Sequence, residues 1–149
     1  MWAGAAMWPI AATRITFFDH LTFRTAYTYA HYTFRGESAF SGNFLLGQPR
    51  HLLRAELPYQ HPCGFWASPF LDWSPAEYFA DGANTAPNDA YAVLGLKAGY
   101  DWRPLGLFFE ANNLANKLCS ASVQVDSGHP RFYERANGRS FYGGARWHF

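Results

Sequence analysis

The chain has little charge, and neither sign dominates. Only 15% of its 149 residues are charged, and Lys plus Arg number 12 against 11 for Asp plus Glu, so the formal charge is +1. A protein that binds nucleic acid through its phosphates needs an excess of basic residues, which this sequence lacks. We therefore expect no nucleic acid partner. A chain of this length is sufficient for a single domain, residues 1–149.

Long apolar runs and catalytic motifs are also missing. No stretch of 18 apolar residues occurs, which excludes a helical membrane protein. The six histidines are scattered without an HExxH motif, and the two cysteines, Cys63 and Cys119, form no CxxC pair. Ser120 and Ser140 lack the GxSxG context of a nucleophile, and no motif pairs two carboxylates. The sequence therefore predicts no metal site, no cofactor and no enzyme.

What the chain does contain is alternation. Aromatic residues make up 19% of it, and apolar and polar residues alternate in segment after segment. A period of two is typical of β-strands whose two faces differ. The pattern predicts about seven strands, of which the first is the weakest. The predicted strands are 5–18, 20–34, 53–60, 65–73, 91–101, 107–112 and 141–149.

The joints between these strands alternate in length. Short turns are expected at 19–20, 61–64 and 102–106, where Pro, Gly and Asp are the usual turn residues. The other joints, which include 35–50, 80–89 and 119–137, are longer. In an antiparallel sheet, successive joints lie at opposite ends, so all short turns should share one end. Short turns at one end and long loops at the other are typical of outer-membrane β-barrels.

Aromatic residues concentrate near both ends of the predicted strands. Two such belts are similar to the girdles that lie at the level of lipid headgroups. The belt at the short turns comprises Phe17, Phe18, Tyr59, Phe65, Trp66, Tyr100, Trp102, Trp147 and Phe149. The belt at the long loops comprises Tyr32, Phe34, Tyr78, Phe79, Tyr91 and Phe141.

The end of the chain carries the most specific pattern. Residues 138–149 read GRSFYGGARWHF, which alternates and ends in Phe. This segment resembles the C-terminal strand by which the barrel-assembly machinery recognises outer-membrane proteins. The resemblance implies that role for the terminal aromatic and for the outward positions. These residues are Phe141, Gly143, Ala145, Trp147 and Phe149.

Three further stretches strengthen this resemblance: GNFLLGQPRH at 42–51, DAYAVLGLKAGYDW at 89–102 and FEANNLANK at 109–117. From about residue 20 to residue 149, the chain resembles the last strands of TonB-dependent outer-membrane receptors. These are energy-coupled importers of siderophores, other metal complexes, cobalamin and some sugars. The chain departs from the family pattern at Leu46, where proline is usual, and at Asn116 and Cys119, where an Asp and an aromatic often follow NL.

The resemblance implies an all-β fold, an antiparallel transmembrane β-barrel segment of about seven strands without a plug domain. A complete receptor has a plug, a TonB box and twenty-two strands, so residues 1–149 are expected to be a C-terminal fragment that does not transport alone. The implied location is the outer membrane of a Gram-negative bacterium. The implied partners are outer-membrane lipid, the barrel-assembly machinery, a metal-chelate ligand and, only through the missing plug, the TonB system.

Ligand contacts are expected in the long loops, because loops carry function more often than strands do. The candidate contacts are Arg35, Arg50, Asp81, Arg131, Tyr133 and Arg135. On this topology, Cys63 and Cys119 lie at opposite ends of the sheet, so we predict no disulfide between them.

Two alternatives remain open from the residues alone. One is a small eight-stranded outer-membrane barrel with a structural or adhesive role, for which the length is suitable. The other is a soluble β-barrel whose apolar face points inward and holds a small ligand.

Overall fold

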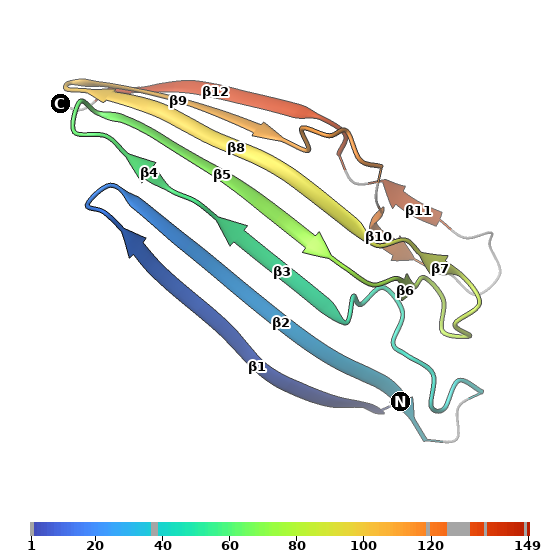
Figure 1. The fold of residues 1–149 in the computed structure, drawn as a ribbon. Helices are drawn as coiled ribbons and strands as arrows, with labels where there is room; N and C mark the ends of the chain where they lie inside the picture. Colours follow the sequence, from blue (N-terminus) through green and yellow to red (C-terminus); the bar gives the residue numbers. More distant parts are fainter. Residues whose placement is uncertain (1, 37–38, 119, 125–131, 136, 148) are drawn as a thin grey trace.

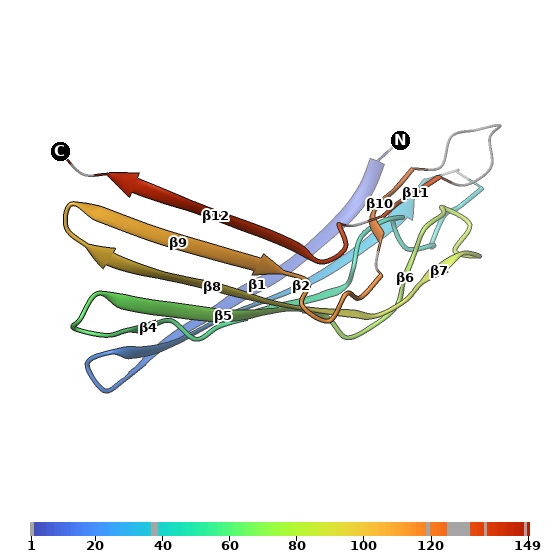
Figure 2. The same cartoon turned by 90° about the horizontal axis from the view of Figure 1, so that it is seen from above.

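The computed structural model is an open antiparallel sheet that is bent and twisted rather than flat (Figures 1 and 2). It describes residues 2–36, 39–118, 120–124, 132–135, 137–147 and 149, with side chains from residue 11 onward except in 120–124 and 132–135. The main sheet contains β1 (Trp2–Phe17), β2 (Leu21–Arg35), β3 (His51–Glu56), β4 (Tyr59–Gln60), β5 (Phe65–Ser74), β8 (Tyr91–Trp102), β9 (Leu105–Asn112) and β12 (Ser140–Trp147).

The strands follow one another in the order β1-β2-β3-β5-β8-β9-β12, and every neighbouring pair is antiparallel. β3 and β4 share one place between β2 and β5, so the sheet has the seven positions that the alternation predicts. They are separated at Leu57 and Pro58, because proline has no N–H to donate to the ladder. Hydrogen bonds nevertheless continue across the break, from Leu57 N to Pro69 O at 3.0 Å and from Thr22 N to Pro58 O at 2.9 Å.

The first strand is longer and better paired than the sequence pattern predicts. β1 pairs with β2 from Trp2 to Phe17, and its register shifts between Trp8 and Ala11. Pro9 lies inside that shift, where its missing N–H does least harm. The irregularity also explains why alternation is weak in this segment, since a bulge changes which face each later side chain occupies.

The short turns all lie at one end of the sheet, together with the C-terminus, and the long connections lie at the other end, together with the N-terminus (Figure 1). This confirms the predicted arrangement. The turn between β8 and β9 is shorter than expected and consists of Arg103 and Pro104. The long connections also contain two small hairpins that the alternation does not predict. They are β6 (Tyr78–Phe79) with β7 (Pro87–Asn88), and β10 (Ser120–Gln124) with β11 (Phe132–Arg135).

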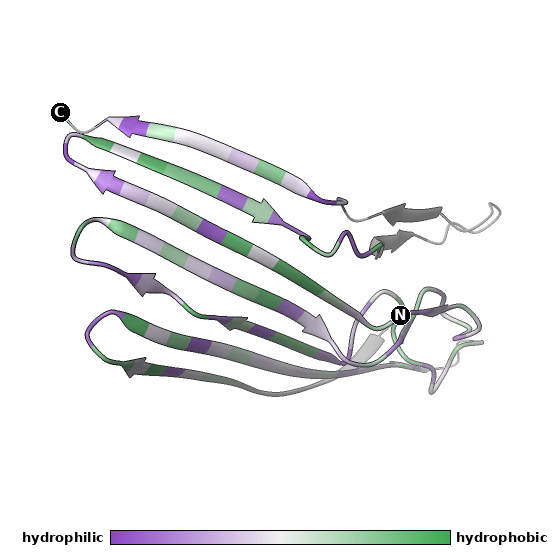
Figure 3. Cartoon of the chain, turned by 45° about the horizontal axis from the view of Figure 1, so that its top comes forward, coloured by the Kyte–Doolittle hydropathy of each residue, from purple (hydrophilic) through white to green (hydrophobic). Residues whose placement is uncertain are grey.

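The strand register separates the side chains into an apolar face and a polar face. On the apolar face, Tyr100 pairs with Leu107, which in turn pairs with Ala145. On the polar face, Lys97 pairs with Glu110. The alternation of hydrophobic and hydrophilic bands along each strand is visible in Figure 3.

The apolar face is not covered by any other part of the described chain. The accessible surface is 10332 Å², whereas a compact protein of this mass exposes about 7,700 Å². Among the described residues, only Phe34, Phe70, Tyr78, two alanines near the loops and Ala111 are buried hydrophobic residues. Phe109 and Trp147, which a soluble barrel would enclose, are 44% and 58% exposed. The soluble alternative is therefore wrong, and the described sheet contains no eighth position for a small closed barrel.

The aromatic belts are only partly as predicted. At the short-turn end, Phe65, Tyr100 and Trp147 lie exposed on the apolar face, as expected. Trp66 and Tyr91 instead lie on the polar face. Each is the sequence neighbour of a residue on the apolar face, Phe65 and Ala92 respectively, and neighbouring residues of a strand point to opposite faces. At the loop end, Phe34 and Tyr78 are buried, 8% and 7% exposed, so the loops cover them.

Three glycines on the polar face make room for aromatic rings on the neighbouring strand. Gly95 faces Phe70, Gly99 faces Trp66 and Gly144 faces Phe108 in the register. A Cβ atom at Gly95 would overlap the Phe70 ring, with two ring carbons at 2.5 and 2.7 Å. Aromatic rings that cover glycines in this way pin the register of a sheet.

We therefore predict that Gly95→Ala destabilises the sheet, because the added methyl displaces the Phe70 ring. The expected loss is about 1–3 kcal/mol, as for other overpacked sites. Gly143→Ala is the matched control, since its nearest atom, Phe108 O, lies at an ordinary 3.5 Å. The measurement is the urea midpoint of the chain refolded in detergent micelles. Equal midpoints for the two variants would contradict the role of the ring.

Candidate functional site

Ion pairs cross the polar face from strand to strand. Arg54 on β3 contacts Asp72 on β5 through Nη1, at 2.9 and 2.8 Å from the two carboxylate oxygens. The same guanidinium contacts Glu56 Oε1 through Nη2 at 2.9 Å. Exposed pairs of this kind contribute only about 0.2–1 kcal/mol each. These pairs make this face of the sheet polar, as the lumen side of a barrel wall is.

Phe70 is a large side chain buried on the polar face, at 7% exposed. The guanidinium of Arg54 lies 4.9 Å from the centre of its ring, and the ammonium of Lys97 lies 5.6 Å from it. Both distances are within the range of cation–π attraction. The ring therefore holds two cations in place while it packs against Gly95.

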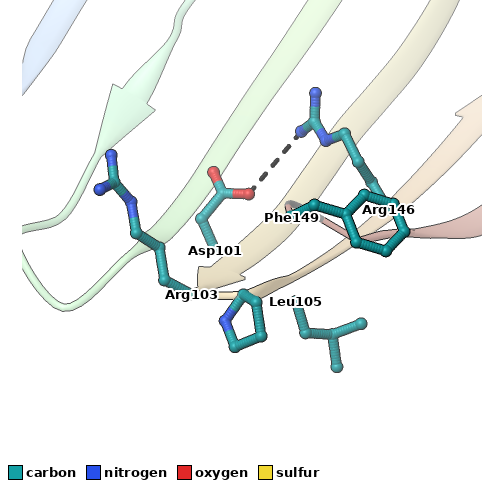
Figure 4. Close-up of a pocket in the computed structure, with 6 residues that line it drawn as sticks. Asp101, Arg103, Leu105, Arg146 and Phe149 are labelled. Carbon is teal, nitrogen blue, oxygen red and sulfur yellow. Dashed lines mark ion pairs between the residues drawn. The ribbon is translucent and has the colours of Figure 1, made fainter.

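A second charged cluster lies at the short-turn end. Arg146 on β12 approaches Asp101 on β8 with Nη2 3.7 Å from Oδ1. Arg103 lies on the other side of Asp101, and Phe149 lies next to Arg146 (Figure 4). With Pro104 and Leu105, these residues line an open hollow of about 550 Å³.

At the other end of the sheet, residues 39–50 dock on the β5–β8 connection. Asn84 clamps the two together, because its Oδ1 accepts a hydrogen bond from Phe44 N at 2.7 Å and its Nδ2 donates to Phe44 O at 3.0 Å. Asn43 Nδ2 donates to Gly82 O at 2.9 Å. The Asn84 backbone adopts φ of 58°, a left-handed conformation that asparagine tolerates better than most residues.

Aromatic rings and one cation complete this contact. The Phe44 ring stacks on that of Phe79, with centres 6.2 Å apart, and the Arg50 guanidinium lies 4.7 Å from the centre of the Phe44 ring. His31 meets the same Phe44 ring edge to face. The two loops thus form one unit, which we call the loop platform: residues 39–50 and 75–90.

The structure brings two of the six predicted ligand residues together on the loop platform. Arg50 contributes the cation over Phe44. Asp81 is 8% exposed, and its carboxylate accepts hydrogen bonds from Thr85 N, Thr85 Oγ1 and Ala86 N, so it orders the turn. Arg35 is exposed where β2 ends.

The other three predicted ligand residues lie in the β10–β11 region. Tyr133 and Arg135 belong to β11, where only the backbone is described, and Arg131 lies outside the described residues. Cys63 is a free, exposed thiol, whereas Cys119 also lies outside the described residues, so the absence of a disulfide stays a prediction.

Sequence reasoning missed the residues that organise the platform. Asn43, Phe44 and Asn84 make the loop-to-loop contacts, and the sequence analysis singled out none of them for this role. The available clue was the DGAN segment at 81–84, since Asp, Gly and Asn are typical of tight turns. The segment indicates a turn but does not indicate which distant loop the turn binds.

The four outward positions of the predicted assembly signal share the apolar face of β12. Phe141, Gly143, Ala145 and Trp147 pair with Ala111, Phe109, Leu107 and Leu105 on β9. Phe141 stacks on Phe109 with ring centres 6.1 Å apart, and the terminal Phe149 is fully exposed.

No helix in the described part of the chain is long and apolar enough to cross a membrane. No group of three or more His, Cys, Asp or Glu side chains among the described residues is arranged to hold a metal ion.

The fold and its two faces agree with the comparisons with known proteins. The family model described as "TonB dependent receptor-like, beta-barrel" matches residues 4–114. This chain therefore belongs to the TonB-dependent receptor β-barrel family. No curated protein matches it significantly in sequence.

Solved structures with the same fold include three receptors. The ferric yersiniabactin uptake receptor FyuA from Yersinia pestis is 14% identical, with a TM-score of 0.74 over 90% of this chain and 22% of that one. The ferric citrate transporter FecA in its unliganded form is 19% identical, with a TM-score of 0.75 over 85% and 21%. The siderophore receptor PiuA from Acinetobacter baumannii is 18% identical, with a TM-score of 0.72 over 90% and 20%.

This chain thus spans about a fifth of the length of the solved receptors that it matches. The family and these three proteins are receptors and transporters rather than enzymes, and the family resides in the outer membrane of Gram-negative bacteria. The predicted family and fold class are confirmed.

We predict that Asn84→Gly releases the 39–50 loop from the platform, because glycine keeps the backbone conformation but removes the side-chain clamp. The loss of these hydrogen bonds should cost about 1–2 kcal/mol. Hydrogen exchange of the amides of Phe44 and Leu45 measures the release.

The matched control is Asn116→Gly. Asn116 also has a positive φ, of 52°, and its Oδ1 accepts a hydrogen bond from Arg139 N, but it lies in the connection that follows β9. It should leave exchange in 39–50 unchanged. Unchanged exchange in the Asn84 variant as well would show that the clamp does not hold the loops together.

Proposed function

We propose that this chain forms the C-terminal wall of an outer-membrane receptor that takes up siderophore-type iron or other metal complexes with energy from the TonB system. The observation that carries the proposal is an apolar face that no other part of the described chain covers, opposite a charged face. Only lipid on one side and enclosed water on the other satisfies both faces. The family match and the iron-complex receptors among the similar folds support the substrate class.

The strand directions support a role as part of a larger barrel. Neighbouring strands are antiparallel throughout, so β1 and β12, the first and last of seven positions, run in the same direction. Joining them to each other would make a parallel pair. An antiparallel closure therefore needs an odd number of additional strands, and both outer edges would otherwise carry unpaired backbone groups that hydrocarbon cannot satisfy.

The loop platform is the proposed site of first contact with the metal complex. It lies at the end opposite the short turns, which face the periplasm in barrels of this kind. Arg50, held over Phe44, offers a cation beside aromatic surface, a combination that suits an anionic chelate. Arg35, Arg131, Tyr133 and Arg135 are proposed as further contacts from the neighbouring segments, and Asp81 contributes by ordering the turn.

Phe149 and the outward positions of β12 are proposed to bind the barrel-assembly machinery. We predict that Phe149→Ala lowers the amount of the chain in the outer-membrane fraction several-fold when it is exported in a Gram-negative host. The reason is the loss of a fully exposed terminal aromatic from the apolar edge. Arg139→Ala, at an exposed loop position, is the control and should insert like the unchanged chain. Recovery of the unchanged chain as a soluble periplasmic monomer would contradict the proposal.

Uptake is tested with a chimaera in which this chain replaces the strands of the ferric citrate transporter that it matches. We expect iron uptake from at least one chelate of a labelled panel in a host with TonB, and none in the same host without it. The 149-residue chain alone should give no uptake in either host. A chimaera that reaches the outer membrane but takes up no chelate would overturn the assigned substrate class.

A further inference from the structure

Polar rings gather at one place on the apolar face, where β2 and β3 meet at the loop end of the sheet. His51, the first residue of β3, pairs with Tyr29 on β2. Tyr27 shares this face, since it pairs with Leu53, which belongs to the apolar face of β3. His31 follows two residues after Tyr29, so the register places it on the same face. Two tyrosines and two histidines thus interrupt a face that is otherwise mainly hydrocarbon.

The His51 ring contacts both tyrosine rings and is hydrogen-bonded to one of them. Its centre lies 6.1 Å from that of Tyr27 and 5.0 Å from that of Tyr29. The Tyr27 hydroxyl oxygen lies 2.6 Å from Nδ1 of His51. When this hydroxyl donates the hydrogen bond, the imidazole carries its proton on Nε2, which is then a donor itself. Among the described residues, no hydrogen bond engages this Nε2, the Tyr29 hydroxyl or the His31 ring.

These donors lie in the upper part of the apolar band of a barrel wall. Tyr27 and His31 are six and ten residues from Leu21, where β2 begins at the short-turn end. At a rise of about 3.3 Å per residue, they are about 20 and 33 Å along the strand. A strand tilt of about 40° converts these lengths to heights of about 15 and 25 Å, in an apolar band about 25 Å tall. The cluster therefore reaches the level where hydrocarbon gives way to lipid headgroups.

Unpaired donors at this level need acceptors from outside the chain. A hydroxyl or an imidazole N–H that faces hydrocarbon without a partner is costly. A phosphate monoester supplies three strong acceptor oxygens in one group. Tyrosine and histidine side chains bring no negative charge that would repel it, and a histidine N–H forms a charge-assisted hydrogen bond with phosphate. A lipid with such a headgroup satisfies the cluster from the side that faces the membrane.

The same face is hollowed below the cluster. An open hollow of about 380 Å³ is lined mostly by apolar side chains, which include Ala55, Leu57, Pro69 and Leu71. Ala55 pairs with Leu71 and leaves space because its side chain is small. It lies four residues after His51 on the same face of β3, about 13 Å along the strand at about 3.3 Å per residue. An acyl chain that descends from a headgroup at His51 therefore enters this hollow.

We propose that Tyr27, Tyr29, His31 and His51 bind the phosphate monoester headgroup of a membrane lipid, one acyl chain of which lies in the hollow at Ala55. The inference rests on the proposed function, because this face meets lipid as the outer side of a barrel wall. His51 and Tyr29 donate hydrogen bonds to the phosphate. Tyr27 is a positioning residue, which holds the His51 ring so that Nε2 points away from Nδ1 and its partner.

The test uses the full 149-residue chain refolded in dodecyl maltoside micelles, with bound lipid measured by native mass spectrometry. The probes are dioleoyl phosphatidic acid, whose headgroup is a phosphate monoester, and dioleoyl phosphatidylcholine, which has the same chains without the monoester. We expect phosphatidic acid to bind about ten-fold more tightly, the equivalent of one additional charge-assisted hydrogen bond. Equal binding of the two lipids would overturn the inference.

His51→Phe keeps a ring at the site and removes its nitrogen atoms, so the preference for phosphatidic acid should disappear while phosphatidylcholine binds as before. Tyr27→Phe should reduce the preference several-fold, again without a change for phosphatidylcholine, which a merely structural role would not produce. The matched control is His20→Phe, the same substitution at an exposed position in a short turn, and it should keep the full preference. An unchanged preference in the His51 variant would overturn the site.

A further variant tests the acyl chain without touching the headgroup cluster. Ala55→Phe fills the hollow from a position that faces lipid, so it should weaken the binding of both lipids by the same factor and keep their ratio. Unweakened binding of both lipids would overturn the hollow as the place of the acyl chain.

The remaining outcomes separate this inference from the proposed function. Glycerol 3-phosphate that displaces phosphatidic acid at equal phosphate concentration would overturn the lipid as the ligand and favour a soluble phosphate compound. A chain that takes up detergent but does not distinguish the two lipids overturns this inference alone. A chain that stays a dispersed monomer in buffer without detergent overturns the proposed function, and this inference with it.

Discussion

The structure depends on an apolar sheet face that the protein itself does not cover. In a soluble domain the hydrophobic effect would fold this face inward, because burying apolar area is the main favourable contribution to folding. Here Leu94, Leu107 and Phe109 stay 44–48% exposed, and the surface area exceeds that of a compact monomer. Contact with lipid hydrocarbon supplies the missing burial. Under the proposed function, lipid covers this face and further strands pair with the two outer edges.

The polar face is organised by different means, since it cannot rely on apolar packing. Rings lie over glycines on neighbouring strands, as Phe70 does over Gly95, and fill the space with large side chains in a fixed register. Cations then lie over the ring, and carboxylates neutralise them, as Asp72 does for Arg54. Each such contact is weak in water, so together they set the register and hydration of the face more than its stability.

Strand number, strand order and the grouping of turns and loops could be predicted from the sequence, because a period of two and turn residues are local features. The polar residues Arg54, Lys97 and Glu110 share one face, as the period of two requires. Local patterns failed where distant contacts decide the outcome. Alternation could not show that Trp66 lies over Gly99, or that Pro9 shifts the register of the first strand.

The candidate site was less predictable than the fold for the same reason. Charged residues in a long loop look alike in sequence, and only the folded arrangement distinguishes Arg50 over Phe44 from Asp81, whose carboxylate is taken up by its own turn. The role of Asn84 depends on residues 40 positions away, which no local pattern reveals.

The central claim is that the two faces of the sheet meet different solvents, and spin labels along β8 test it most directly. Single cysteines at Ala92, Leu94 and Ala98 and at Val93, Lys97 and Asp101, in a background without the native thiols, report collision with oxygen in lipid and with a polar nickel complex in water. The account predicts that the first three labels collide mainly with oxygen and the second three mainly with nickel, alternating residue by residue. Equal accessibility of both sets to nickel, or of both to oxygen, would contradict it.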